Sequence, residues 1–207
     1  MQENQIKNEI NKAFGTVDLP HGLFYEFEIA LRFELGGEQY GMDRPIRRFM
    51  QAHQRAMDIA KFLFPEPSNL SIMISSYGDN NGIDTDFSRL KLCFPEINKN
   101  KFSYRSVDDP DYDPNIYRYW HCMQVKDELT LDELLWLDIA SEMPIGPCSI
   151  DHQSYLVDLE RAIIFHAYDD RGLDIVAMKR ETLQPLYDQF SKWLLDYDIK
   201  RMKSIFE

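Results

Sequence analysis

The sequence lacks the features that mark secreted, disulfide-rich and membrane proteins. Its cysteines, Cys93, Cys122 and Cys148, are odd in number and widely spaced, which fits neither a disulfide framework nor a zinc site. No run of about 18 apolar residues is present, so we expect no membrane span. The chain begins with polar and acidic residues, unlike a signal peptide. We therefore expect a cytoplasmic protein.

Positive charge is also scarce. The chain has 23 Lys and Arg residues against 35 Asp and Glu residues, which gives a net charge of -12. Such a charge repels nucleic-acid phosphates and anionic lipid, so we expect neither as a partner. An acidic balance is ordinary for a soluble protein, but it also speeds the encounter with a basic protein. A basic protein is therefore the partner class that the composition favours.

Catalytic motifs are missing as well. The sequence has no Gly-x-Ser-x-Gly nucleophile motif, no phosphate-binding glycine loop and no His-Glu-x-x-His zinc motif. We therefore favour a non-catalytic protein, and we expect no cofactor and no metal site.

What the sequence does contain is the pattern of a β-meander near its C-terminus. Three runs rich in β-branched and aromatic residues follow one another at 155–159, 161–168 and 173–177. Asp169-Asp170-Arg171-Gly172 separates the last two runs. This stretch predicts a tight hairpin turn, because Asp supports turns and Gly can adopt a positive φ. We expect a three-strand meander in which Gly172 has a φ above zero.

The rest of the chain mixes strand and helix patterns without strict alternation between them. Polar–apolar alternation predicts one long strand over 23–35 and shorter strands at 70–75, 89–94 and 117–125. Helices are predicted over 5–14 and 44–64, from a capping box at Thr130, from Thr182 to Tyr197, and after Asp198. Together these patterns predict one α+β domain over 1–207, with a mainly antiparallel sheet of about seven strands, helices packed on it, and a helix after the meander. An irregular acidic excursion is expected at about 98–115.

Several stretches form a specific combination. They are Leu31-Arg32-Phe33-Glu34-Leu35-Gly36, the run from Ile163 to Asp174, Leu186-Tyr187, and Trp193-Leu194-Leu195-Asp196-Tyr197-Asp198. In these stretches the chain resembles a bacterial family catalogued as domain of unknown function 3885. The resemblance brackets nearly the whole chain and supports the α+β fold. It implies no activity, cofactor or catalytic residue.

Polar residues on and near the meander form the candidate ligand site. They are Arg32, Glu34, His166, Asp169, Asp170, Arg171 and Asp174. Carboxylates beside a guanidinium suit hard cations and polar ligands. Turn chemistry, ordinary ion pairs and a packed histidine explain the same residues without any ligand.

A basic stripe lies on the helix predicted over 44–64. Its members, Arg44, Arg48, Gln51 and Arg55, follow one another at steps of four, three and four. We expect this stripe to be solvated or paired internally, and an anion or an acidic segment is the alternative partner.

The candidate partner-binding residues lie in the acidic excursion and are Asp108, Asp109, Asp111 and Asp113. Our leading hypothesis is a non-catalytic cytoplasmic protein that acts through protein contacts, for example an immunity-type protein that masks a basic toxin. The alternative is an enzyme or small-ligand-binding protein that uses the polar groups around the turn from Asp169 to Asp174. The sequence does not indicate an oligomeric state.

Overall fold

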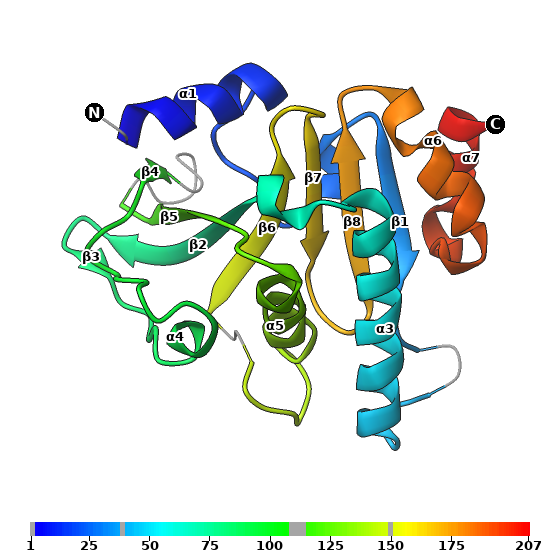
Figure 1. Cartoon of the computed structure of the whole chain (residues 1–207), viewed down its shortest axis with the longest axis horizontal. Coiled ribbons are helices and arrows are strands. Elements are labelled where there is room, and N and C mark those ends of the chain that lie inside the picture. The colour runs from blue at the N-terminus through cyan, green and yellow to red at the C-terminus, as the bar shows by residue number, and fades with distance from the viewer. Residues whose placement is uncertain (1–2, 38–39, 108–114, 149–150) are drawn as a thin grey trace.

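The computed structural model describes residues 3–37, 40–107, 115–148 and 151–207 (Figure 1). Within these residues the chain forms seven α-helices and one antiparallel sheet, which confirms the expected α+β class. The sheet has eight strands, against about seven expected. Seven of them lie in the order β1-β8-β7-β6-β2-β5-β4, and β3 pairs only with β2.

The strands pair with their neighbours throughout in antiparallel register, and the expected meander is confirmed as β6, β7 and β8. Their bounds are β1 Ala30–Glu34, β2 Ser71–Asp79, β3 Gly82–Ile83, β4 Tyr104–Val107, β5 Tyr117–Gln124, β6 His152–Asp158, β7 Ile163–Ala167 and β8 Gly172–Ala177. The meander lies between β1 and β2 in the sheet: its last strand, β8, pairs with β1, and its first strand, β6, pairs with β2.

Helices cover both faces and one edge of the sheet. The α-helices are α1 Glu3–Phe14, α2 Leu23–Glu26, α3 Pro45–Leu63, α4 Leu90–Cys93, α5 Glu128–Ile139, α6 Arg180–Gln189 and α7 Ile199–Phe206. Short 3-10 turns span Pro67–Asn69, Ser191–Trp193 and Asp196–Asp198. In Figure 1, α3 and α5 lie side by side over one face, while α6 and α7 flank the edge strand β1.

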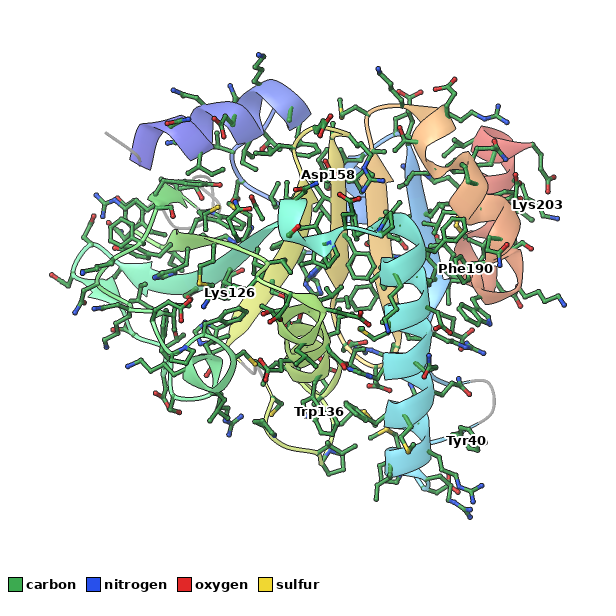
Figure 2. All side chains as sticks on the ribbon, in the orientation of Figure 1. Tyr40, Lys126, Trp136, Asp158, Phe190 and Lys203 are labelled. Atoms are coloured by element: carbon green, nitrogen blue, oxygen red, sulfur yellow. The ribbon has the colours of Figure 1, made fainter. Side chains whose placement is uncertain are left out.

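Aromatic contacts tie these layers together. The ring of Phe64, after α3, meets Phe165 of β7 at 6.1 Å between centroids. Phe190, which Figure 2 places between α6 and α3, meets Phe62 edge-on at 5.4 Å. Edge-to-face contacts of this kind add to the apolar area that the rings bury. The core therefore extends from the sheet to its flanking helices without a break.

The single strand expected over 23–35 is wrong in its first half. Residues Leu23–Glu26 form the helical turn α2, and only Ala30–Glu34 is strand. A strand would point Leu23 and Phe24 to opposite faces, whereas the helical turn buries both completely. The backbone N–H of Phe24 is bound by Asp174 at 3.0 Å, so a contact from far along the chain overrides the local alternation.

Two other expectations in the middle of the chain are corrected. Within the strand expected at 89–94, Leu90–Cys93 instead form the helical turn α4, because Leu90 and the C-cap residue Phe94 are buried four residues apart. The hairpin partner of β2 is instead β3. The excursion at 98–115 contains the strand β4, whose Tyr104 stacks on Trp120 of β5 at 5.9 Å.

Two helix boundaries also differ from expectation. α5 begins before Thr130, because Asp127 is its N-cap and accepts hydrogen bonds from the backbone and hydroxyl of Thr130, both at 2.8 Å. The helix expected from Thr182 to Tyr197 ends at Gln189. Beyond it, the 3-10 turn Ser191–Trp193 is followed by extended backbone at Leu194 and Leu195, so the N–H of Leu195 reaches the carbonyl of Arg32 at 2.9 Å and covers the edge of β1.

Candidate functional site

A band of polar side chains crosses the sheet on the face opposite α3 and α5. Its members, which we call the polar band, are Arg118 of β5, Ser75 of β2, Gln153 and Tyr155 of β6, His166 of β7, Asp174 of β8 and Arg32 of β1. Strand register produces part of the band directly, since His166 lies opposite Asp174, and Asp174 lies opposite Arg32. Three of the sequence-predicted site residues are therefore brought together.

Arg32 and Asp174 form the centre of one end of the band. Arg32 Nε lies 2.6 Å from Asp174 Oδ1 and its Nη2 lies 2.8 Å from Oδ2, a two-point geometry that favours guanidinium–carboxylate pairs. Asp198 adds a second carboxylate at 3.3 Å. Burial lowers the pKa of Arg32, but the hydrogen bonds and charge of Asp174 hold that pKa above its ordinary value.

Arg118 occupies the other end and is buried. It donates to the carbonyl of Leu19 at 2.6 Å and to Asp18 at 3.2 Å, both in the segment that covers the band. Its Nη2 lies 2.9, 3.0 and 3.2 Å from acceptors of Ser75, Gln153 and Tyr155 on the sheet. The hydroxyl of Tyr155 in turn donates to the same Leu19 carbonyl at 3.0 Å. Arg118 therefore fastens the N-terminal segment to the sheet.

His166 lies between the two arginines and is neutral at ordinary pH. Burial lowers the pKa of His166 to about 3. Its Nδ1 lies 2.7 Å from the carbonyl of Ser154, which can only accept, so Nδ1 carries the proton. Nε2 lies 3.4 Å from Nδ1 of the exposed His21, and the ring stacks on Tyr155 at 4.4 Å between centroids. Contacts with Ser154, His21 and Tyr155 thus fix the position of the His166 imidazole.

The β7–β8 turn carries three of the other four predicted residues, Asp169, Asp170 and Arg171, and their ion pairs lie away from the band. Arg171 pairs with Asp169 within the turn and reaches Glu142 at 3.1 Å. Asp170 pairs with Arg48 of α3. The turn is thus tied to itself and to α3.

Gly172 does not have the positive φ that we expected, because the glycines with positive φ in the described residues are Gly15, Gly37 and Gly82. A Cβ at Gly172 would meet the hydroxyl of Tyr168 and lie 2.8 Å from the carbonyl oxygen of Phe33. Close approach of two strands, rather than backbone conformation, requires glycine here.

Glu34 lies at the end of β1 opposite Gly172, and its carbonyl accepts a hydrogen bond from Arg55 at 3.0 Å. Gln51 donates to the carbonyl of Leu35 at 3.0 Å. Most of the basic stripe is therefore used inside the protein, as expected, whereas Arg44 stays exposed. The four acidic candidates for partner binding, Asp108, Asp109, Asp111 and Asp113, lie outside the described residues.

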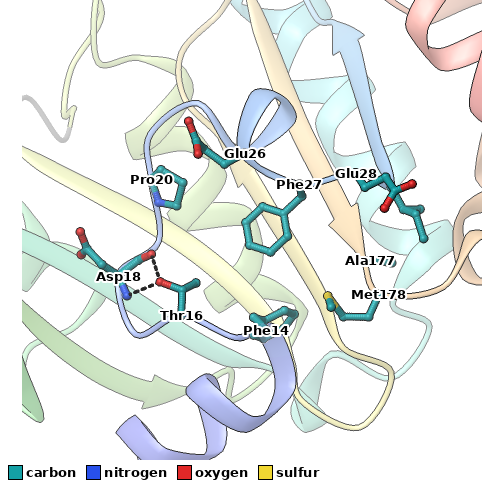
Figure 3. Close-up of a pocket in the computed structure, with 10 residues that line it drawn as sticks. Phe14, Thr16, Asp18, Pro20, Glu26, Phe27, Glu28, Ala177 and Met178 are labelled. Atoms are coloured by element: carbon teal, nitrogen blue, oxygen red, sulfur yellow. Dashed lines mark hydrogen bonds between the residues drawn. The ribbon is translucent and has the colours of Figure 1, made fainter.

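An acidic cavity opens beside the polar band, under the segment that links α1 to β1 (Figure 3). Its volume is about 560 Å³, and its walls include Phe14, Asp18, Glu26, Phe27, Glu28 and Met178. Glu26 and Glu28 are exposed, and Asp18 joins the cavity to the band through Arg118. No Lys or Arg is among the described residues that line it.

The band and the cavity differ in what they can do chemically. The band holds the buried Arg118, the partly covered Arg32 and a neutral imidazole, and the hydrogen bonds of these groups fix the covering segment, so the groups serve the fold. The cavity presents carboxylates to solvent next to aromatic and thioether surface. The sequence did not indicate a role for Asp18 or Arg118. Each is a single charged residue in its own stretch, and the two lie 100 positions apart, so no local pattern links them.

Comparisons with known proteins agree with the resemblance seen in the sequence. The sequence model of the family "Domain of unknown function (DUF3885)" matches residues 6–198. The chain is 22% identical over 205 residues to the uncharacterized protein YnaE of Bacillus subtilis (strain 168), covering 91% of this chain and 96% of YnaE. No solved structure matches significantly. Across the described residues, no helix has both the length and the apolar character needed to cross a bilayer.

Proposed function

The chain belongs to the DUF3885 family, and we propose that it is a non-catalytic protein whose acidic cavity accepts a basic side chain of a protein partner. The observation that supports this proposal is the lining of the cavity by Asp18, Glu26 and Glu28, of which Glu26 and Glu28 are exposed while Asp18 pairs with Arg118. Phe14 and Phe27 in the same walls add aromatic faces, which attract cations. The net charge of -12 steers a basic partner towards such a surface.

The shape of the cavity suits a long basic side chain. Lys and Arg bury an aliphatic stem against apolar surface while the charged head stays among polar groups. Here Phe27 and Met178 offer the apolar surface, and Glu26 and Glu28 offer the carboxylates at the rim. A volume of about 560 Å³ is within the range of pockets that enclose a ligand group.

The test begins with affinity capture from the native host at low ionic strength, identification of the captured protein, and measurement of its association with the purified chain. We expect a basic partner whose association slows as ionic strength rises from about 0.05 to 0.5 M, because the screening length falls from roughly 14 to 4 Å. Glu26→Gln with Glu28→Gln should weaken binding by roughly tenfold or more, since each charged hydrogen bond contributes about 1.5–3 kcal/mol.

A charge-matched control distinguishes the effect of the cavity carboxylates from the effect of the net charge of the protein. Glu66→Gln with Asp84→Asn removes the same number of charges from exposed positions outside the cavity, and should change binding much less. An acidic partner, an association rate independent of salt, or equal effects from the two double variants would each contradict the proposal.

A more specific form of the proposal is an immunity-type protein that masks a basic toxin. Co-expression with the captured partner then restores growth, and the Glu26→Gln, Glu28→Gln variant does not. Whether the acidic segment contributes stays a prediction, which neutralisation of Asp108, Asp109, Asp111 and Asp113 in the same binding assay checks.

A further inference from the structure

Exposed apolar side chains gather where α3, α4 and α5 meet. Five of the twelve large exposed hydrophobics in the described residues lie there: Ile46, Met50, Leu92, Leu129 and Trp136, with exposed fractions of 68, 64, 63, 69 and 37%. We call them the α3–α5 surface. Scattered exposed apolar residues are normal, but a contiguous group of this kind marks an interaction site.

The contacts of α3 with α5 make this surface continuous. The two helices run antiparallel, because Lys61 pairs with Glu128, His53 lies 3.0 Å from Asp132, and Phe49 meets Trp136 at 4.4 Å between centroids. Ile46, Met50 and His53 follow one another at steps of four and three, so they form one stripe of α3 that leads to Trp136. Figure 2 shows Trp136 beside this half of α3.

A groove of about 450 Å³ continues the stripe along α5. Leu92, Leu129 and Trp136 form its apolar walls, and Asp132 and Glu133 are its only Asp or Glu residues in the described lining, which contains no Lys or Arg. The outer side of α5 therefore exposes Leu129 and Trp136 at positions where a solvated helix would usually carry polar residues. The N-terminal end of α3 projects past the sheet, so this region is open to another molecule (Figure 1).

Charge is distributed unequally along the surface. Arg44 and Arg47 are exposed at the N-terminal end of α3, and together with Asp43 beside them these three described residues carry one net positive charge. Asp132 and Glu133 lie on the other side of Met50 and Trp136, between Trp136 and Leu129 along α5. A surface with basic residues on one side of a central apolar pair and acidic residues on the other is complementary to itself under a two-fold rotation about that pair.

We propose that a second copy of this chain binds the α3–α5 surface about a two-fold axis near Met50 and Trp136. The rotation brings Arg44 and Arg47 of each protomer to Asp132 and Glu133 of the other, and buries Ile46 and Leu129. The acidic cavity lies on the opposite face of the sheet and stays open in this dimer. Dimerisation and partner binding are therefore tested separately, and either can fail alone.

Sedimentation velocity over a range of protein concentrations measures the dimer directly. We expect a concentration-dependent shift from monomer to dimer in the wild type. Leu129→Gln should raise the dissociation constant of the dimer at least about tenfold. Burying one leucine side chain lowers a dissociation constant by about ten- to a hundredfold, and in a two-fold symmetric dimer the substitution is present in both protomers. Tyr197→Gln is the control, since Tyr197 is exposed and lies near the C-terminus, in the turn that precedes α7.

Charge reversal tests the orientation of the two copies. Arg44→Glu with Arg47→Glu makes both ends of the surface acidic, and Asp132→Lys with Glu133→Lys makes both ends basic. Each variant alone should be monomeric, whereas their mixture should form a heterodimer, because every interface then joins an acidic end to a basic end. Glu133→Lys alone, at an exposed position, serves as a milder second variant if the double lysine variant melts early.

A wild type that stays monomeric up to several hundred micromolar would overturn the proposal. So would a dimer unaffected by Leu129→Gln, or reversed variants that fail to pair although both melt like the wild type. None of these outcomes affects the acidic cavity. Loss of partner binding by Glu26→Gln with Glu28→Gln in an intact dimer would support both proposals at once.

Discussion

Replacing Asp174 by Asn tests whether the polar band holds the fold together. The Asp174 side chain is fully buried, and the partly covered Arg32 side chain is only 11% exposed. Asn keeps a carbonyl oxygen for the N–H of Phe24, which Asp174 binds at 3.0 Å, but it removes the charge that faces the guanidinium. The variant therefore isolates the ion pair from the backbone hydrogen bond.

The expected cost follows from leaving the largely covered guanidinium of Arg32 incompletely paired. Removing one partner of a buried ion pair costs about 3–5 kcal/mol, and Asp198 at 3.3 Å still offsets part of the charge on Arg32. We expect a loss of about 3 kcal/mol, which is a large share of a typical total of about 5–15 kcal/mol. With an m-value of about 2–3 kcal/mol/M, the urea midpoint falls by about 1 M.

Urea denaturation followed by circular dichroism measures this loss, with Asp84→Asn as the control. That change removes a charge from an exposed position and should stay within about 0.5 kcal/mol of the wild type. A double-mutant cycle with Arg32→Met should give a coupling energy of about 1–3 kcal/mol. A cost for Asp174→Asn below about 1 kcal/mol, or additive single effects, would refute our account of the band.

Two further predictions concern the meander. Gly172→Ala should destabilise the protein by about 1–3 kcal/mol in the same assay, because its Cβ would lie 2.8 Å from the Phe33 carbonyl oxygen. Arg171→Ala should cost under about 1 kcal/mol, because the Arg171 side chain is 61% exposed. A larger cost for Arg171→Ala than for Gly172→Ala would contradict this prediction. His166 binds a proton in the unfolded chain below about pH 6.5 but in the folded chain only near pH 3, so stability should fall as pH drops through this window, by about 2 kcal/mol from His166 between pH 6.5 and 5. The loss should shrink in His166→Gln, and an unchanged pH profile in that variant would count against a buried neutral imidazole.

Much of the fold was predictable because its signals are local. The runs that become β6, β7 and β8 alternate or concentrate β-branched residues between short turns, and such patterns depend only on neighbours in the sequence. The same holds for α3, whose apolar steps of three and four extend from Pro45 to Leu63 and end at Pro65. The family resemblance rests on the same kind of contiguous stretch.

The errors arose where a distant contact outweighed the local pattern. The alternation of 23–35 is a sound strand signal, but binding of the Phe24 N–H by Asp174, 150 residues later, turns its first part into α2. Gly172 was correctly marked as a required glycine for the wrong reason, since the neighbouring strand, not the turn, leaves no room for a Cβ. The backbone conformation of a turn depends on residues that are neighbours in the sequence, whereas the close approach of two strands depends on tertiary packing.

The candidate sites divide in the same way. Alternation indicated that Arg32 and Glu34 share a strand face, and the sequence alone determined that the protein is acidic and that its last three strands form a meander. Only the tertiary structure decided that Arg32, Asp174 and His166 meet, that Arg118 anchors Asp18, and that apolar side chains of α3 and α5 form one surface. The physical reason is that strand order and helix docking set these neighbours, and both arise from the burial of the whole chain rather than from any segment of it.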